Sequence, residues 1–293
     1  MFFLDKKLIH IIITKKRSDN VLEKLITDKT NIIYLEDKNI TKDEYKSIIC
    51  ESISFSRKKD YLKMIKKYNN QIYIFKEKGM NYYGLINELI GSFLAKKINL
   101  DTVSYDICKC DGKLGIASKN FKDEKYDYKY LNDLTIIKPY IFALSNINNI
   151  KEECITQENK DSIINQILKL ICLDLYMCQR DRNMSNIQFK IDKDTNYLSL
   201  APIYDYYDCL DNLSVLYNAI ISLSDDSIRM LLNNYSNFSD ILKETISIPM
   251  TQLIDEIACY YGFNKDNFIY QNLIDYYEIK QEKQKNYLKR YTK

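Results

Sequence analysis

The sequence predicts an α+β fold in two parts, a small strand-rich part followed by a larger, mainly helical part. Three patterns in its 293 residues support this division. Residues 71–75 alternate isoleucine with aromatic side chains, as a half-buried strand does. Asp111-Gly112 separates two further strand-like runs and is typical of a tight hairpin turn. After residue 122 helical patterns prevail, and the most apolar is 161–177, where Asp161 is expected to cap the helix N-terminus.

The chain is expected to divide into three segments. Residues 1–50 alternate short β-branched runs with a helical stretch and form an α/β extension of unassigned role. Residues 51–121 form a strand-rich lobe, and residues 122–293 form a helical lobe whose last helix runs from Asn267 into a basic tail. Because no repeat or low-complexity linker separates them, the two lobes should share one compact unit.

The strongest chemical signal is Asp181, followed five residues later by Asn186 and, after a short strand–turn–strand stretch, by Asp205. Phosphoryl transfer from ATP needs one carboxylate to orient and deprotonate the acceptor hydroxyl. It also needs an amide and a second carboxylate to hold Mg²⁺ on the phosphates. A hairpin would return Asp205 to the side of Asn186. Asp208 is a competing metal ligand, and we rank Asp205 first because its spacing fits that return.

The loop Asp181-Arg-Asn-Met-Ser-Asn186 and the downstream Pro202-Ile-Tyr-Asp205 resemble two motifs of the HipA-like serine/threonine kinases. Upstream, Ile72-Tyr-Ile-Phe-Lys76 is similar to the family's ATP-anchoring strand, and Glu88 lies in a stretch similar to its lysine-pairing helix. The resemblance covers roughly residues 52–210. It implies a protein-kinase-like fold, ATP and Mg²⁺ as cofactors, a catalytic Asp from the first motif, and γ-phosphate transfer to a Ser or Thr hydroxyl of a protein.

By the same resemblance, Lys76 and Glu88 form the ion pair that positions the α- and β-phosphates of ATP. Glu88 lies twelve residues after Lys76 and off the apolar stripe of its own helix, on a flank from which it can face the lysine. The stretch from Ser118 to Phe121 is similar to the family's connection between the lobes, where backbone groups hydrogen-bond adenine. We therefore assign Ser118 and Phe121 to nucleotide binding.

A glycine-rich loop over the phosphates is missing, because no glycine precedes Gly79. Residues 52–60 are the expected substitute, since hydroxyl, backbone N–H and cationic groups there can face phosphates. In HipA-like kinases the matching loop can carry an autophosphorylated serine, and Ser54 and Ser56 are the candidates here. The same serines are equally expected as caps of a helix at 61–67.

The catalytic loop leaves two points open. Arg180 and Arg182 flank Asp181, and three roles suit them: neutralising charge in the transition state, binding a phosphorylated residue, or pairing with nearby carboxylates. Asn183 stands where relatives often carry a histidine, which puts the loop geometry in question more than its chemistry, since Asn still hydrogen-bonds backbone groups.

Composition excludes several other classes of protein. A net charge of +3 gives no field that favours direct nucleic-acid binding. The eight cysteines form no CxxC pair and His10 is the single histidine, which argues against a zinc site or a Ser-His-Asp hydrolase. No stretch approaches the ~18 apolar residues of a membrane span, and the start lacks a signal-peptide profile. We expect a cytoplasmic protein with reduced thiols and no membrane contact.

Three functions stay open at the level of sequence. The first is a HipA-type protein kinase, for which the resemblance also implies a protein substrate and a role as a toxin with an antitoxin or regulatory partner. The second is a small-molecule kinase of the aminoglycoside-phosphotransferase type, although that group usually has an Ile-Asp motif where Pro202-Ile-Tyr-Asp205 stands. The third is a pseudokinase that binds without turnover; the missing glycine loop favours it and the complete acidic set opposes it.

Overall fold

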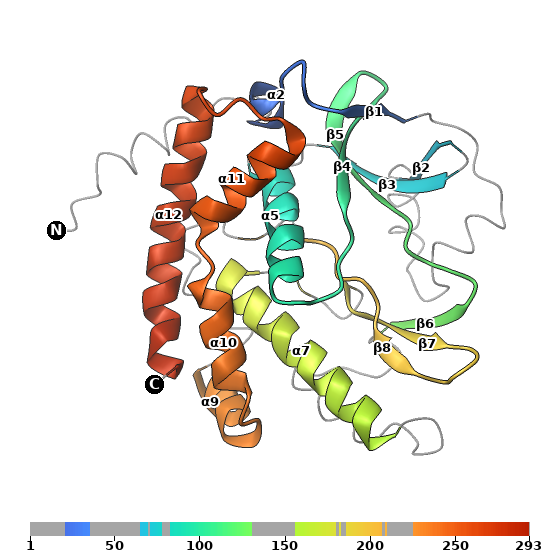
Figure 1. Ribbon diagram of the computed structural model, residues 1–293, viewed down its shortest axis with the longest axis vertical. Coiled ribbons are helices and arrows are strands. Elements are labelled where there is room, and N and C mark those ends of the chain that lie inside the picture. Colours follow the sequence, from blue (N-terminus) through green and yellow to red (C-terminus); the bar gives the residue numbers. More distant parts are fainter. Residues whose placement is uncertain are drawn as a thin grey trace.

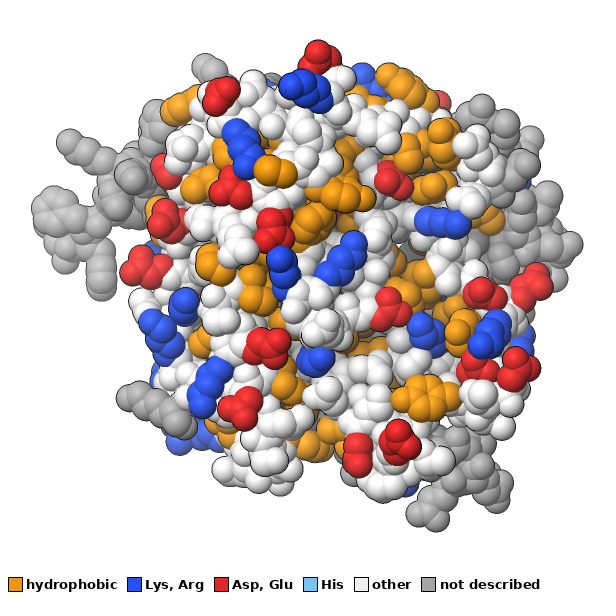
Figure 2. Space-filling model, in the orientation of Figure 1, with side chains coloured by type: hydrophobic (Ala, Val, Ile, Leu, Met, Phe, Trp, Pro, Cys, Tyr) orange, Lys and Arg blue, Asp and Glu red, His pale blue; other side chains and the backbone are white. Residues whose placement is uncertain are grey.

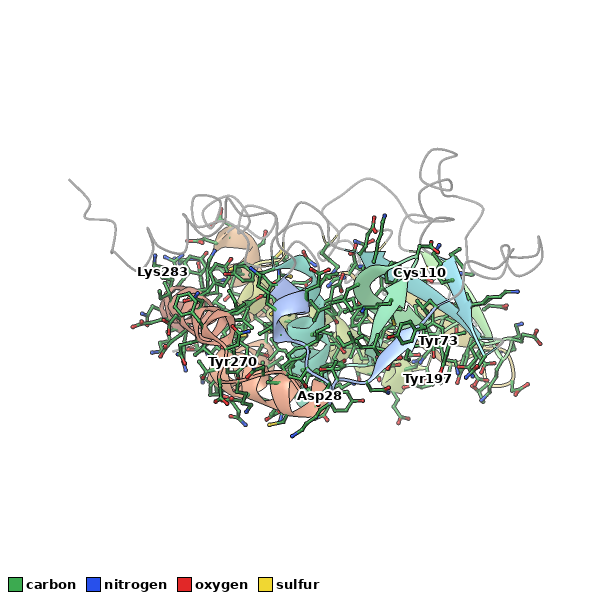
Figure 3. The ribbon with its side chains drawn as sticks, turned by 90° about the horizontal axis from the view of Figure 1, so that it is seen from above. Asp28, Tyr73, Cys110, Tyr197, Tyr270 and Lys283 are labelled. Carbon is green, nitrogen blue, oxygen red and sulfur yellow. The ribbon has the colours of Figure 1, made fainter. Side chains whose placement is uncertain are left out.

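A computed structural model describes residues 21–35, 65–69, 71–77, 83–130, 156–179, 182, 186–206, 209 and 225–292. It confirms the expected α+β fold with a strand-rich part and a larger, mainly helical part (Figure 1). Seen from above, Tyr73 and Cys110 of the small lobe's sheet lie on the opposite side of the molecule from Tyr270 and Lys283 of the last helix (Figure 3). On the face drawn in Figure 2, acidic and basic side chains are interspersed, in keeping with the small net charge.

The small lobe is built on one sheet, with its strands in the order β1-β4-β5-β3-β2. The strands are β1 (Ile32–Tyr34), β2 (Ile65–Tyr68), β3 (Gln71–Glu77), β4 (Tyr105–Cys110) and β5 (Lys113–Lys119). All neighbours are antiparallel except β1, which pairs parallel with β4. The predicted hairpin at Asp111-Gly112 joins β4 to β5. Both turn residues have positive φ, 50° and 75°, as a two-residue type I′ turn requires.

Helix α5 (Gly84–Lys97) lies between the two lobes and is buried on almost all sides. It contacts β4 on one side and the helices α7 and α11 of the larger lobe on others. The predicted apolar stripe is present, and Leu89 within it is fully buried. The polar side chains of Asn87 and Glu88 are fully buried as well. Because burying an unpaired polar group costs several kcal/mol, these two residues must find partners inside the protein.

The larger lobe holds most of the helices. They are α7 (Gln157–Met177), α9 (Asp225–Asn234), α10 (Phe238–Ser247), α11 (Met250–Tyr261), α12 (Phe268–Leu288) and the short 3-10 helix η6 (Lys289–Tyr291). A second sheet of β6 (Tyr126–Tyr130), β7 (Gln188–Asp192) and β8 (Leu198–Leu200) lies beside α7. Asn267 caps α12, as its position in the sequence suggested. Across the described ranges, none of the helices has the length and apolar character needed to span a bilayer.

Helix α7 begins earlier than predicted. Thr156, not Asp161, is its N-cap, and the Thr156 side chain accepts a hydrogen bond from the Asn159 N–H at 3.1 Å. The Asn159 side chain then bonds both backbone groups of Leu198 on β8. A polar residue in the first turn is therefore held by a strand that lies far along the chain, which is why the apolar pattern alone placed the start too late.

Part of the N-terminal segment belongs to this same core. Helix α2 (Val21–Leu25) packs against α12, and its apolar side chains join the core that contains α5. The Leu25 carbonyl accepts a hydrogen bond from the Asn264 N–H at 2.8 Å, at the turn between α11 and α12. Strand β1 then adds the parallel edge strand to the small lobe's sheet. Residues 21–35 thus contact both lobes.

Candidate functional site

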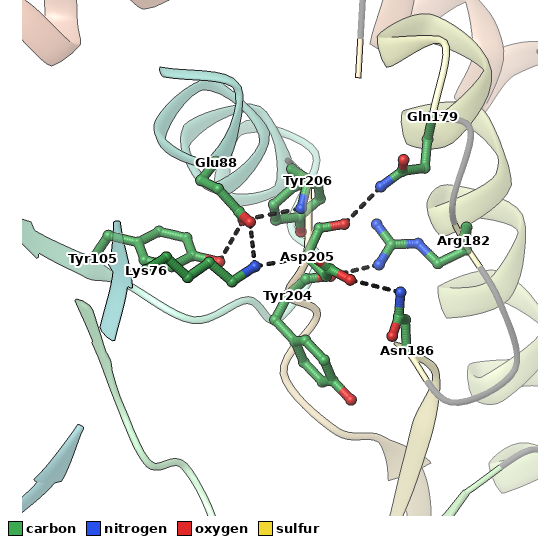
Figure 4. A network of polar contacts seen from close by, with 9 residues as sticks. All are labelled: Lys76, Glu88, Tyr105, Gln179, Arg182, Asn186, Tyr204, Asp205 and Tyr206. Carbon is green, nitrogen blue, oxygen red and sulfur yellow. Dashed lines mark hydrogen bonds and ion pairs between the residues drawn. The ribbon is translucent and has the colours of Figure 1, made fainter. Parts of the chain in front are cut away.

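The site begins with Lys76, near the end of β3. Its ammonium is ion-paired with Glu88 on α5, the partner expected from the sequence, and with Asp205, whose Oδ1 lies 2.8 Å away (Figure 4). The side chain of Lys76 is 15% exposed. Burial acts to lower the pKa of Lys76, but the two carboxylates outweigh it and raise the pKa above its ordinary value. Lys76 therefore carries its positive charge at any physiological pH.

Glu88 is a fully buried carboxylate with three donors around it. Its Oε1 pairs with Lys76, and its Oε2 accepts hydrogen bonds from the Tyr105 hydroxyl at 2.6 Å and from the Tyr206 N–H at 2.9 Å (Figure 4). Burial, and then the negative charge of Glu88, raises the pKa of Tyr105 well above its usual value. Tyr105 accordingly stays protonated and keeps donating. A buried charge is tolerated only when it is paired and hydrogen-bonded in this way.

Asp205 lies in the left-handed region, with φ of 67°, which is uncommon for a residue other than glycine. Three contacts hold it there. Its Oδ1 bonds Lys76, its Oδ2 accepts from the Asn186 amide at 2.7 Å, and its carbonyl accepts from the Gln179 amide at 2.6 Å. Burial acts to raise the pKa of Asp205, but the charges of Lys76 and Arg182 and the Asn186 hydrogen bond lower it overall. The carboxylate is therefore ionised at neutral pH.

Arg182 connects helix α7 to the segment that carries Asp205 (Figure 4). Its guanidinium pairs with both carboxylate oxygens of Asp174 on α7, at 3.0 and 3.1 Å, and both side chains are almost fully buried. It also donates to the Tyr204 carbonyl and lies 5.2 Å from the centre of the Tyr206 ring. Of the three roles left open by the sequence, the structure shows the pairing with a nearby carboxylate. Arg182 thereby links α7 to the residues on either side of Asp205.

This pair gives a prediction about stability. Arg182→Met should lower the free energy of unfolding by about 3–5 kcal/mol, because it leaves the Asp174 carboxylate buried without its counter-charge. Urea denaturation of the purified variant measures the loss. The double variant Arg182→Met/Asp174→Leu should recover most of it, since no charge is then left in the interior. If the double variant were as unstable as the single one, the buried ion pair would not account for the loss.

The residues assigned to adenine take two different positions. Ser118 is a buried residue inside β5 and is paired with β3 on one side and β4 on the other. Phe121 lies beyond the end of that strand, and its ring centre is 5.9 Å from that of Tyr204, next to Asp205. Four other assigned residues lie outside the described ranges: Asp181, Ser54, Ser56 and the competing ligand Asp208.

The oxygen donors at this site fit a magnesium ion. In the parts of the chain that the structure describes, no group of three or more His, Cys, Asp or Glu side chains is placed to hold a metal. Asn186 and Asp205 instead offer one amide and one carboxylate in direct contact. Mg²⁺ is commonly held by one or two carboxylates, with phosphate and water oxygens completing its shell, so this pair suits a metal that arrives with a nucleotide.

Several residues of the network carry no signal in the sequence. Tyr105 and Gln179 belong to no motif, and Asp174 is one polar residue in an apolar helix. Their roles depend on contacts between elements that only the fold brings together. Tyr206 directly follows Asp205, and this adjacency was the one clue to its involvement.

The chain is similar to known kinases in sequence and in fold. A family model described as HipA-like kinase matches residues 56–200, a range that includes Lys76, Glu88 and Asn186 and ends before Asp205. The crystal structure of CtkA, a proinflammatory kinase of Helicobacter pylori, is similar with a TM-score of 0.51 and 16% identity. The match covers 78% of this chain and 92% of that one.

A second similar structure is HipA of Shewanella oneidensis MR-1, solved in a toxin–antitoxin complex with HipB and its operator DNA. The TM-score is 0.50 and the identity 11%, over 76% of this chain and 60% of the HipA chain. The comparison with curated proteins gave no match. At these identities the two structures establish a shared fold, and the family model adds the sequence evidence. Across residues 56–200 the chain is thus similar in sequence to the HipA-like kinases, and its fold is the one that CtkA and HipA share.

Proposed function

We propose that this protein is an ATP- and Mg²⁺-dependent kinase that transfers the γ-phosphate to a Ser or Thr hydroxyl of another protein. One observation carries the proposal. Lys76 on β3, Glu88 on α5, Asn186 before β7 and Asp205 after β8 come from four separate parts of the chain and meet in one network of ion pairs and hydrogen bonds (Figure 4). They are the residue types that phosphoryl transfer requires, in the order in which they occur in kinases.

Each residue has a role that suits its surroundings. Lys76 presents a permanent positive charge for the α- and β-phosphates, and Glu88 fixes its direction. Asp205 and Asn186 would hold the metal, through one carboxylate and one amide oxygen. When bound, Mg²⁺-ATP supplies the phosphoryl group and the metal neutralises charge that develops on it. Asp181, between Gln179 and Arg182 in the sequence, accepts the proton of the acceptor hydroxyl.

A protein substrate and a cognate antitoxin are part of the same proposal. The HipA-like family match and the fold shared with HipA support it, because HipA was solved in a complex with HipB. Phosphoproteomics on cells expressing the wild type beside Asp181→Ala tests the substrate class. We expect phosphoserine or phosphothreonine sites on cellular proteins that appear with the wild type alone. Identical phosphoproteomes, with phosphate transfer by the purified protein to a small-molecule acceptor such as an aminoglycoside, would overturn it.

The serines of the glycine-free loop give a second prediction. A loop with side chains cannot approach phosphates as closely as a glycine-rich one, so Ser54 or Ser56 would present a hydroxyl at the site instead of bare backbone. Mass spectrometry of the full chain after incubation with Mg²⁺-ATP should find phosphate on one of them. The Asp181→Ala control should show none, which excludes a contaminating kinase. Phosphate on other residues alone, or none while activity persists, would defeat this prediction.

A further inference from the structure

Three residues on one side of α5 contact the chain just after Asp205. The Glu88 carboxylate accepts the Tyr206 N–H at 2.9 Å, and the Asn87 amide donates to the Cys209 carbonyl at 2.6 Å. Between them, the Tyr206 ring lies directly on Gly91, where an added Cβ would come within 2.3 Å of the ring carbon Cγ. Tyr206 and Cys209 are both fully buried. We call Asn87, Glu88 and Gly91 the α5 dock.

The Asn87 amide can take only one orientation in this dock. The Cys209 carbonyl is an acceptor, so the amide must turn its NH₂ group toward it. Its oxygen then faces α12, where the Tyr277 hydroxyl donates to it at 2.5 Å. With the amide reversed, two oxygens would face each other in a fully buried space. The Cys209 carbonyl therefore decides which way the amide faces, and the Tyr277 hydroxyl holds it in that orientation by donating to the amide oxygen; both Asn87 and Tyr277 are fully buried.

The dock has a consequence for Asp205. The left-handed backbone of a non-glycine residue costs of order 1–3 kcal/mol and persists only where the surroundings over-determine it. Gln179 and Arg182 hold the chain at Asp205 and Tyr204, on the upstream side. The α5 dock holds it on the downstream side, at Tyr206 and Cys209. Releasing one side allows Asp205 to relax away from Asn186 and Lys76.

We infer that Asn87 is a positioning residue for the kinase reaction, that Tyr277 orients its amide, and that both act through Tyr206 and Cys209 on Asp205. This inference rests on the proposed function, in which Asp205 binds the metal. A positioning residue differs from one that merely stabilises the core in what its mutation changes. Mutating a positioning residue alters the Mg²⁺ dependence of turnover, whereas mutating a structural residue alters stability alone.

The sharpest variant is Tyr277→Phe, which keeps the ring and removes the hydroxyl that orients Asn87. Tyr270→Phe is the matched control, because it lies on the same helix and its hydroxyl donates to Asp255 on α11, away from Asp205. ADP release by the full-length protein at saturating ATP is measured across a Mg²⁺ titration. We expect Tyr277→Phe to lower kcat about tenfold, as the loss of one buried hydrogen bond allows, and to raise the half-saturating Mg²⁺ concentration. Tyr270→Phe should leave both at wild-type values.

A second readout does not depend on turnover. Cys209 and Cys172 are both fully buried, and Cys172 lies inside α7, outside the dock. Mass spectrometry of the rate of iodoacetamide labelling at each thiol should show faster labelling of Cys209 in Tyr277→Phe and in Asn87→Asp, with Cys172 unchanged. Cys172 thus reports global unfolding, should Asn87→Asp fold poorly.

The two readouts separate the inference from the proposed function. Wild-type labelling of Cys209 together with wild-type kcat and Mg²⁺ dependence in Tyr277→Phe would overturn the role of Asn87 and leave the kinase proposal standing. Absence of ATP turnover in the wild-type protein would overturn the kinase proposal, while faster Cys209 labelling in the variants would still establish the dock.

Discussion

The Asp181→Ala variant is expected to bind Mg²⁺-ATP as the wild type does and to lose phosphoryl transfer by about 10²- to 10⁴-fold, the usual contribution of a general base. The reason is that Asp181 is assigned to the acceptor hydroxyl, whereas the nucleotide is assigned to Lys76, Asn186 and Asp205. Calorimetry measures the binding and ADP release measures the turnover.

Asp194→Ala is the control for loss of a nearby carboxylate, because Asp194 is an exposed residue in the turn between β7 and β8. It should behave as the wild type in both assays. An Asp181→Ala protein with wild-type turnover would remove Asp181 from the catalytic role, and loss of ATP affinity in that variant would move it to nucleotide binding.

The Asp205→Asn variant is expected to lose Mg²⁺-ATP affinity by at least about 10- to 100-fold. Mutating a residue that only hydrogen-bonds a metal ligand typically lowers metal affinity by about 10- to 100-fold. Asp205 is assigned as a direct, charged ligand, so its loss should cost at least as much. Asn186→Ala should lose less, because a neutral amide contributes less to a hard cation than a carboxylate does. Calorimetry with Mg²⁺-ATP, repeated with ATP in EDTA, separates the part of the affinity loss that depends on the metal from the part that does not.

Removing the Asp205 charge also deprives Lys76 of one of its two carboxylate partners, so some loss of ATP affinity is expected even without metal. The diagnostic is that the loss with Mg²⁺ exceeds the loss in EDTA. Equal Mg²⁺-ATP affinity in Asp205→Asn and the wild type would exclude Asp205 as the ligand and transfer the assignment to Asp208.

The sequence predicted those parts of the fold that depend on local pattern. The hairpin at Asp111-Gly112 and the helix that carries Glu88 were found because turn chemistry and apolar spacing are properties of a few neighbouring residues. The start of α7 was placed wrongly because Asn159 is held by Leu198, a contact that no local pattern encodes. The parallel pairing of β1 with β4 was missed for the same reason.

For the site, too, residues in locally patterned elements were predicted and contacts between distant elements were not. The contact between Lys76 and Glu88 was expected from the resemblance to the HipA-like kinases, and both residues lie on elements with a clear local pattern. The pairing of Arg182 with Asp174 was left open, since the sequence offers several carboxylates and only the fold brings this one to Arg182. The contact of Asn87 with Cys209 joins residues 122 positions apart and has no signature in the sequence.

Kinase chemistry itself is measured most simply by ADP release from ATP, with the purified full-length protein in Mg²⁺ and in EDTA, beside Asp205→Asn in Mg²⁺. A site in which Asp205 and Asn186 bind the metal and Lys76 binds the phosphates predicts turnover by the wild type in Mg²⁺, none in EDTA, and a severe loss in Asp205→Asn. No turnover by the wild type in Mg²⁺, or equal turnover by Asp205→Asn, would contradict it.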